Sequence, residues 1–167
     1  MHQLFVVCIL QLMQIHLISV GNRMPSWVQQ GFNEYSKRMP RDCEVVLKEV
    51  LPGKRSKNSN LKRIVRDEGE RMIKALSTKS HVVTLDIPGK PWTTPELAKV
   101  MNRWMESGQN IALMVGGPEG LSDSVKDLAR ESWSLSKLTL PHPLVRVLVA
   151  EQLYRAWSIL NNHPYHR

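Results

Sequence analysis

Hydrophobic and polar positions divide the chain into short apolar runs separated by longer amphipathic stretches. The apolar runs are rich in β-branched side chains, which is typical of strands. In the longer stretches apolar residues recur every three or four positions, which predicts helices that bury one face. The predicted strands cover 14–20, 44–51, 81–86, 110–115 and 133–140, of which the last is a strand or an extended loop. Five helices are predicted. The first opens at Pro25, the second covers 61–76, the third follows an N-cap at Thr94 and ends at Gly108, the fourth follows a cap at Ser122, and the fifth covers 144–160.

This alternation of strands and helices predicts a single α/β domain with a mostly parallel sheet, because each parallel neighbour needs a crossover connection. His81 to Asp86 reads HVVTLD, a nearly continuous apolar run of the kind found in strands buried on both faces. The sequence contains no internal repeat, linker or low-complexity tract. One domain over residues 13–167 accounts for these features.

The first twelve residues stand apart from this pattern. Leu4 to Leu12 reads LFVVCILQL and resembles the apolar core of a signal peptide, yet no basic residue precedes it and no small-residue cleavage site follows it. The first predicted strand begins directly after Met13. We therefore expect Met13 to be the natural start and residues 1–12 to be a non-native extension from an upstream start codon. The alternative is an extra edge strand or a hydrophobic arm.

The chain is basic, and its positive charge is concentrated. Of its 167 residues, 23 are Lys or Arg and 15 are Asp or Glu, a net charge of +8 that favours a polyanionic partner, nucleic acid before an acidic membrane. Residues 53–74 contain eight basic and three acidic side chains and so hold +5 of that charge. Such a stretch is often a solvated helix face, but cations as dense as those in GKRSKNSNLKR repel one another without a phosphate partner.

Composition also excludes several classes of protein. No apolar run is long enough for a membrane-spanning helix. Two cysteines, Cys8 and Cys43, make neither a disulfide framework nor a zinc site, and they suit a reducing cytoplasm. The motifs G-x-S-x-G and H-E-x-x-H are absent, so the sequence indicates neither a serine hydrolase nor a metal-dependent peptidase.

The candidate ligand-binding segments lie at the ends of three predicted strands. The turn Gly116 to Gly120 follows a buried strand, and its glycines allow positive φ and a close approach of backbone to a ligand. It matches neither the dinucleotide fingerprint nor a P-loop. If the third, fourth and fifth strands are neighbours, this turn meets 85–89 and 134–141 in one crevice whose apolar lining suits an adenine ring. A plain tight turn with core packing is the simpler alternative, and Asp86 and Glu119 fit either an acid–base pair or structural roles.

Four segments resemble one enzyme family. They are VGNRMPSWVQQGFNEY (20–35), TLDIPGKPWTTPEL (84–97), LMVGGPEGLS (113–122) and SWSLSKLTLPHPLVRVLVAEQLYRAWSILNNHPYHR (132–167). These residues are similar to the ribosomal RNA large subunit methyltransferase H family, small enzymes of the SPOUT class. The similarity runs from Met13 to the C-terminus.

The resemblance implies a SPOUT-type α/β knot, in which the C-terminal segment is threaded through a loop as a deep trefoil knot. It also implies a cytoplasmic homodimer that binds S-adenosylmethionine, in a bent form, as methyl donor and needs no metal. The donor-binding residues that the resemblance implies are Leu85, Gly116, Gly117, Leu135, Ser136, Lys137, Leu138, Thr139 and Leu140.

The family's substrate is a pseudouridine of 23S ribosomal RNA, methylated at N3 on the assembled ribosome. The N3–H is weakly acidic, so the reaction needs a cation that stabilises the developing anion or a histidine that takes the proton. The candidates for these roles are His142, Arg146, Arg155, His166 and Arg167. The candidate RNA contacts are Lys54, Arg55, Lys57, Lys62, Arg63 and Tyr165, the last by stacking on a base beside a partner protomer's site.

Two alternatives stay open. The tail 162–167 is either a functional clamp or a frayed terminus. The protein is either the enzyme or a non-catalytic RNA-binding, ribosome-associated module of the same fold. The glycine turn together with LSKLTL (135–140) favours the enzyme, and the HPYHR ending (163–167) and the small size disfavour a SPOUT enzyme of transfer RNA.

Overall fold

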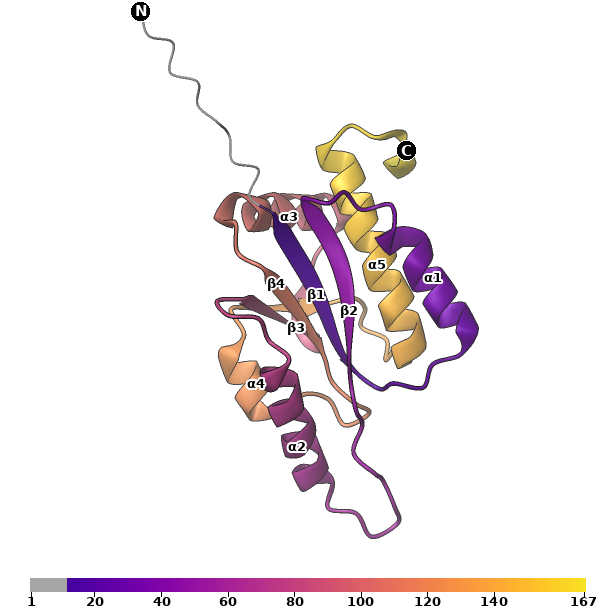
Figure 1. The fold of residues 1–167 in the computed structure, drawn as a ribbon, viewed down its shortest axis with the longest axis vertical. Helices are drawn as coiled ribbons and strands as arrows, with labels where there is room; N and C mark the ends of the chain where they lie inside the picture. The colour runs from indigo at the N-terminus through magenta and orange to yellow at the C-terminus, as the bar shows by residue number, and fades with distance from the viewer. Residues whose placement is uncertain (1–11) are drawn as a thin grey trace, which may run out of the picture.

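The computed structural model of the protein describes residues 12–167, so the expectation for residues 1–12 lies outside the described residues apart from Leu12. Strands and helices alternate along this range (Figure 1). The strands are β1 (Met13–Val20), β2 (Cys43–Val50), β3 (His81–Pro91), β4 (Ile111–Val115) and β5 (Glu131–Ser134). The helices are α1 (Ser26–Ser36), α2 (Leu61–Lys74), α3 (Thr94–Ser107), α4 (Asp123–Leu128), α5 (His142–Leu160) and the short 3-10 turn η1 (Pro164–His166).

The five strands form one parallel sheet in the order β2-β1-β4-β3-β5. β3 therefore pairs with β4 on one side and with β5 on the other. The predicted single α/β domain with a parallel sheet is confirmed, and so is the condition on which the crevice depends, that the third strand lies between the fourth and the fifth. The predicted trefoil knot stays a prediction.

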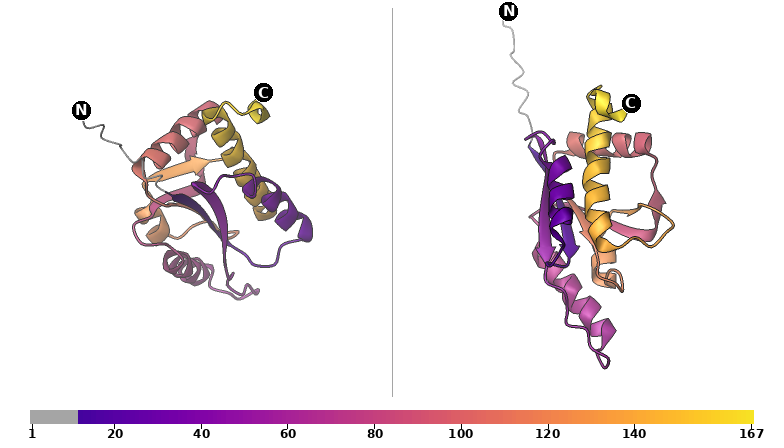
Figure 2. Two further views of the ribbon diagram at one scale, coloured as in Figure 1. Left: turned by 45° about the horizontal axis from the view of Figure 1, so that its top comes forward. Right: turned by 90° about the vertical axis from the view of Figure 1, so that its right-hand side faces the viewer.

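Helices cover both faces of the sheet, which explains why its central strands are apolar at nearly every position. On one face, α1, α3 and α5 pack on the odd-numbered residues of β1 and β4, such as Ile15 and Leu113. On the other face, α2 and α4 pack on the even-numbered residues, such as Ile18 and Met114. Figure 2 shows α5 running along the sheet with the C-terminus at its far end.

The element boundaries differ from the predicted ones in ways that local chemistry explains. The cap of α3 is Thr93, which forms a capping box with Glu96, so the predicted N-cap at Thr94 is wrong by one residue. α5 starts two residues earlier than predicted, at His142. The ladder between β3 and β5 shifts register between Leu85 and Lys90, which leaves 86–89 unpaired at the carboxyl edge. The predicted strand 133–140 is a strand only up to Ser134.

One contact ties α2 and α4 together. Gly69 is buried in the middle of α2, where a Cβ atom would overlap the Ser122 hydroxyl. Ser122 is the N-cap of α4, as predicted, and accepts a hydrogen bond from the Val125 amide. α2 therefore packs directly against the segment that joins β4 to α4. No helix in the 12–167 range is long and apolar enough to cross a bilayer.

We predict that Gly69→Ala lowers the free energy of unfolding by about 1–3 kcal/mol through overpacking, although alanine has the higher helix propensity. Urea denaturation followed by circular dichroism measures the change. Glu70→Ala, at the exposed neighbouring position, is the matched control and should shift stability by less than about 0.5 kcal/mol. A more stable Gly69→Ala protein would show that the two helices are not in close contact.

Candidate functional site

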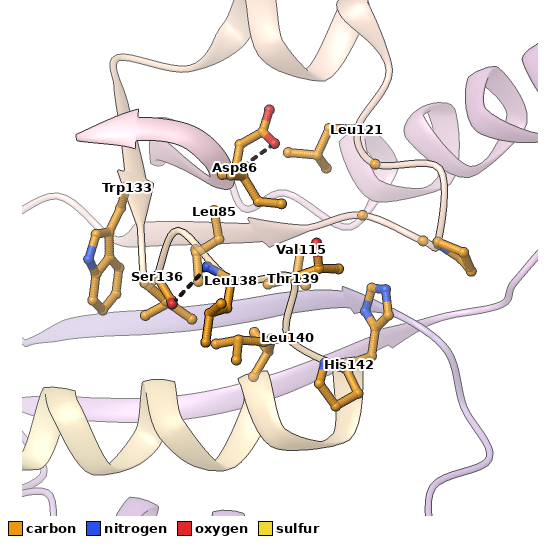
Figure 3. Close-up of a pocket in the computed structure, with 18 residues that line it drawn as sticks. Leu85, Asp86, Val115, Leu121, Trp133, Ser136, Leu138, Thr139, Leu140 and His142 are labelled. Atoms are coloured by element: carbon orange, nitrogen blue, oxygen red, sulfur yellow. Dashed lines mark hydrogen bonds between the residues drawn. The ribbon is translucent and has the colours of Figure 1, made fainter. Parts of the chain in front are cut away.

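The carboxyl ends of β3, β4 and β5 surround a cavity of about 510 Å³. Its lining residues fall in three segments: 85–87 where β3 leaves its ladder with β5, 115–121 at and after the end of β4, and 133–145 from the end of β5 into α5 (Figure 3). The predicted crevice is therefore confirmed. Its lining residues are Leu85, Asp86, Ile87, Val115, Gly116, Gly117, Pro118, Gly120, Leu121, Trp133, Leu135, Ser136, Leu138, Thr139, Leu140, Pro141, His142 and Val145.

Most of the cavity wall is apolar, and polar groups are few. Leu85 projects from β3 toward the loop that holds Ser136 and Leu138, as Figure 3 shows. That loop is held by the Ser136 hydroxyl, which accepts a hydrogen bond from the Leu138 amide at 3.0 Å. The Leu138 side chain is 72% exposed at the rim. Apolar walls with a few fixed polar groups are typical of sites for a flat heteroaromatic ligand.

The glycine turn works differently from the expectation. Only Gly120 has a positive φ, of 86°. A Cβ at Gly116 would overlap the Gly120 carbonyl, and a Cβ at Gly117 would lie 2.8 Å from Arg55 Nη2. The missing side chains of these two glycines therefore make room for the protein's own atoms, and the close approach of their backbone to a ligand stays a prediction. The turn still forms one wall of the cavity.

His142 is the histidine that reaches the cavity. It begins α5, and its Nδ1 atom is buried without a hydrogen-bond partner among the described residues. Burial lowers the pKa of this imidazole below its ordinary 6.5, and the Arg146 charge lowers it further. Interaction with the Gly117 backbone raises the pKa but does not outweigh burial. The ring is therefore neutral at pH 7, and a neutral imidazole can accept a proton.

Comparison with known proteins identifies the fold family. The family model for predicted SPOUT methyltransferases matches residues 13–166. The chain belongs to the SPOUT methyltransferases. A protein named ribosomal RNA large subunit methyltransferase H, from Methylococcus capsulatus, is 59% identical over 155 residues, which make up 93% of this chain and 100% of that protein. This identity places the chain in the ribosomal RNA large subunit methyltransferase H family.

Two arginines of the methyltransferase that were candidates for catalysis are already paired. Arg146 is 1% exposed and donates to Glu49 and to the Gly21 carbonyl, both at 2.6 Å, so it joins α5 to the ends of β1 and β2. Arg155 donates to Glu151 from one turn earlier in α5. Neither side chain lines the cavity.

The C-terminal tail is packed rather than frayed. The Tyr165 hydroxyl donates to Glu151, and its ring lies 4.7 Å from the Tyr154 ring, between centroids. His166 has a buried Nδ1 atom without a partner within residues 12–167, and Arg167 is exposed. α5 has 19 residues and at 1.5 Å per residue spans about 28 Å. The contacts with Glu151 and Tyr154 place the tail beside the second half of α5, away from His142 at the start of that helix.

The predicted RNA contacts divide into two groups. Lys54, Lys57 and Lys62 are exposed and make no ion pair within the described part of the chain, and Arg63 is exposed beside Asp67. Arg55 is different, since its guanidinium contacts both Glu68 and Glu119.

The remaining predicted residues are also placed. Lys137 is exposed on the loop after β5 but does not line the cavity. Asp86 lies 3.4 Å from Lys126 and caps its own turn, which fits a structural role for this carboxylate. Between residues 12 and 167 no three His, Cys, Asp or Glu side chains converge as a metal site. Trp133 and Leu121 line the cavity and were missed, although both lie beside segments singled out in the sequence.

We predict that NMR titration of the His142 ring gives a pKa below 6.5, because burial disfavours the imidazolium. The unfolded chain then binds the proton more readily, so the free energy of unfolding falls as the pH drops through about 6.5. His142→Gln should remove this part of the pH dependence. The same resonance measured in denaturing urea is the control, and a folded-state pKa at or above the urea value would contradict the prediction.

Proposed function

We propose that this protein transfers a methyl group from S-adenosylmethionine to N3 of a pseudouridine in large-subunit 23S ribosomal RNA, acting on the assembled ribosome in the cytoplasm. The observation that supports it best is the apolar cavity at the carboxyl ends of β3, β4 and β5, in a chain of the SPOUT methyltransferase family. The name of the Methylococcus relative supports the substrate, ribosomal RNA of the large subunit.

The residues present fit the methyl donor. A cavity of about 510 Å³ falls within the range of about 300–1,000 Å³ that is usual for ligand sites. Leu85, Leu138 and Leu140 offer apolar faces to an adenine ring, while the backbone of 116–117 and of 135–139 offers polar groups. The unpartnered Nδ1 atom of His142 leaves a buried polar group for a ligand to satisfy.

S-adenosylmethionine bound in this cavity would supply an electrophilic methyl group on its sulfonium sulfur. The chain's own part is to hold the target nitrogen in line and to take its proton. His142 suits the second task because it lines the cavity and its lowered pKa leaves the ring unprotonated at neutral pH, with a nitrogen free to accept a proton. His142 would take the N3 proton while the methyl group's bond to sulfur breaks and its bond to N3 forms, which would leave a neutral thioether and an imidazolium.

The exposed cations of 54–63 fit the RNA backbone. Lys54, Lys57 and Lys62 have no carboxylate partner in the described range, so phosphates can approach them without first breaking an ion pair. They lie on the loop before α2 and on its first turn. We assign to this surface a contact with the ribosomal RNA that is independent of base identity.

A second copy of the chain fits the face formed by the first turns of α1 and α5. These two helices lie side by side (Figure 1). Trp27 on α1 and Leu144 and Leu148 on α5 are 46%, 42% and 38% exposed, and contact with a second copy would cover these apolar side chains. No residue of the tail 162–167 lines the cavity of its own chain, so we assign His166 and Arg167 to the site of another copy.

A non-catalytic RNA-binding module is the competing function, and donor binding separates the two. We predict that the wild-type protein binds S-adenosylmethionine in calorimetry and transfers radiolabelled methyl groups to large ribosomal subunits. Leu138→Ala should weaken donor binding about tenfold, since it removes apolar contact area. Leu128→Ala, an equally conservative change at an exposed leucine on α4 outside the cavity, is the control. Wild-type protein that shows no saturable heat would support the binding module instead.

The assignment of the tail to a partner's cavity has its own test. We predict that Gly116→Val and the double variant His166→Ala/Arg167→Ala are each inactive as homodimers, one in the cavity and the other in the tail. A heterodimer of the two, purified with two different affinity tags, keeps one site with both parts intact. It should recover about half of the wild-type methylation rate, because one of two sites is complete. An inactive heterodimer would contradict sharing of the site between copies.

A further inference from the structure

A single guanidinium joins the basic loop to the wall of the cavity. Arg55 donates Nη1 to Glu68 Oε1 at 2.9 Å and Nη2 to Glu68 Oε2 at 3.2 Å. Its Nε lies 3.1 Å from both Glu119 oxygens, and its Nη2 lies 2.5 Å from one of them. Glu68 belongs to α2 and Glu119 to the glycine turn, so one side chain connects three segments.

Arg55, Glu68 and Glu119 form an ion triad, and further hydrogen bonds fix its buried pair, Arg55 and Glu68. The Glu68 side chain is 3% exposed, and its Oε1 atom also accepts a hydrogen bond from the Gly53 amide at 2.7 Å. Arg55 in turn donates to the Gly53 carbonyl at 3.0 Å. A buried carboxylate with both oxygens occupied fixes the guanidinium in one orientation. That orientation aims the remaining donors at Glu119.

The glycine turn is fitted closely against this triad. A Cβ atom at Gly117 would lie 2.8 Å from both Arg55 Nη2 and Glu68 Oε2, so the bare backbone of the turn touches the charged groups. The opposite side of the same backbone lines the cavity. Beyond the turn, Ser122 packs against Gly69 of α2. α2 therefore supports the turn at both ends, through charge at 117–119 and through close packing at Ser122.

We propose that Arg55 and Glu119 are positioning residues for the methyl donor: the ion triad holds the turn 116–120 in the shape that forms the donor site. This role rests on the proposed function for the identity of the ligand. It also removes Arg55 from the RNA contacts, because phosphate would have to displace two carboxylates to reach it. The exposed lysines on either side, Lys54 and Lys57, retain the phosphate-binding role.

The requirement for arginine at position 55 follows from geometry. A guanidinium offers five N–H donors in a planar fork and can bind two carboxylates at once. A lysine ammonium is a point charge on a flexible stem and cannot hold both in fixed directions. The pKa of the Glu119 carboxyl is lowered chiefly by the Arg55 hydrogen bonds, so the pair stays charged at neutral pH.

The test uses Glu119→Gln and Arg55→Lys. Glu119 is the more exposed carboxylate, and glutamine keeps its shape, so this variant should fold; circular dichroism and thermal melting check that it does. In both variants we expect the dissociation constant and the KM for S-adenosylmethionine to rise about fivefold or more. The kcat and the affinity for large ribosomal subunits should stay within about twofold of wild type. Lys57→Ala should show the opposite profile, with weaker ribosome binding, a smaller salt dependence and unchanged donor affinity.

Amide hydrogen exchange gives a readout that needs no ligand. In both triad variants the amides of 117–120 should exchange faster than in wild type, and in Lys57→Ala they should not. Unchanged exchange in the turn, or unchanged donor affinity in Glu119→Gln, would overturn the positioning role. A parallel loss of donor affinity, ribosome affinity and folded fraction would also overturn it, because that is the effect of general destabilisation. If the wild type binds no S-adenosylmethionine, the proposed function fails, and hydrogen exchange still decides whether the triad shapes the turn.

Discussion

Parallel pairing of β3 with both β4 and β5 is the constraint on which the site depends. Because all three strands run in the same direction, their carboxyl ends meet at one edge, and the segments that follow them have to share that edge. The register shift in β3 widens it, since residues 86–89 leave the ladder before the strand resumes at Lys90. A Cβ at Gly89 would lie 2.7 Å from the Trp133 carbonyl carbon, so the returning chain fits closely against β5.

The second support of the site comes from the other face of the sheet. The buried carboxylate of Glu68 on α2 holds the glycine turn through Arg55 of the preceding loop, an arrangement in which loss of one partner costs about 3–5 kcal/mol in general. Such a network contributes less to net stability than to a single defined geometry. Its location, directly behind one wall of the cavity, suggests that geometry is what it supplies here. The basic loop is thereby fixed relative to the cavity, although the cations that face solvent are other residues.

Much of the fold could be predicted from the sequence, because hydrophobic periodicity and the residues that cap helices or form turns are local signals. The apolar runs and the amphipathic stretches between them predicted the order of strands and helices. The small and apolar residues at the ends of three strands predicted the crevice. Strand order is set by long-range pairing, so the neighbours of β3 could be stated only as a condition. The cap at Thr93 was missed because two adjacent threonines offer the same hydroxyl, and only the contact with Glu96 separates them.

The roles of individual charged and glycine residues could not be predicted, because each depends on a partner distant in sequence. Arg55 and Glu119 are 64 positions apart, so a basic cluster read along the chain looks like a uniform phosphate surface. Gly116 and Gly117 have the composition of a ligand-binding loop, yet their missing side chains accommodate the protein itself. The sequence left the tail as either a functional clamp or a frayed terminus, because the contact of Tyr165 with Glu151 on α5 depends on the fold.

The central claim is that the crevice between the strand ends is where the methyl donor binds. A crystal structure with S-adenosylhomocysteine, the demethylated product of the donor, tests it most directly. The account predicts density for its adenine ring among Leu85, Leu138 and Leu140, with the glycine turn against the ligand and the Arg55–Glu119 pair intact behind it. Ligand density at another place on the molecule, with the crevice filled only by solvent at saturating ligand, would contradict the account.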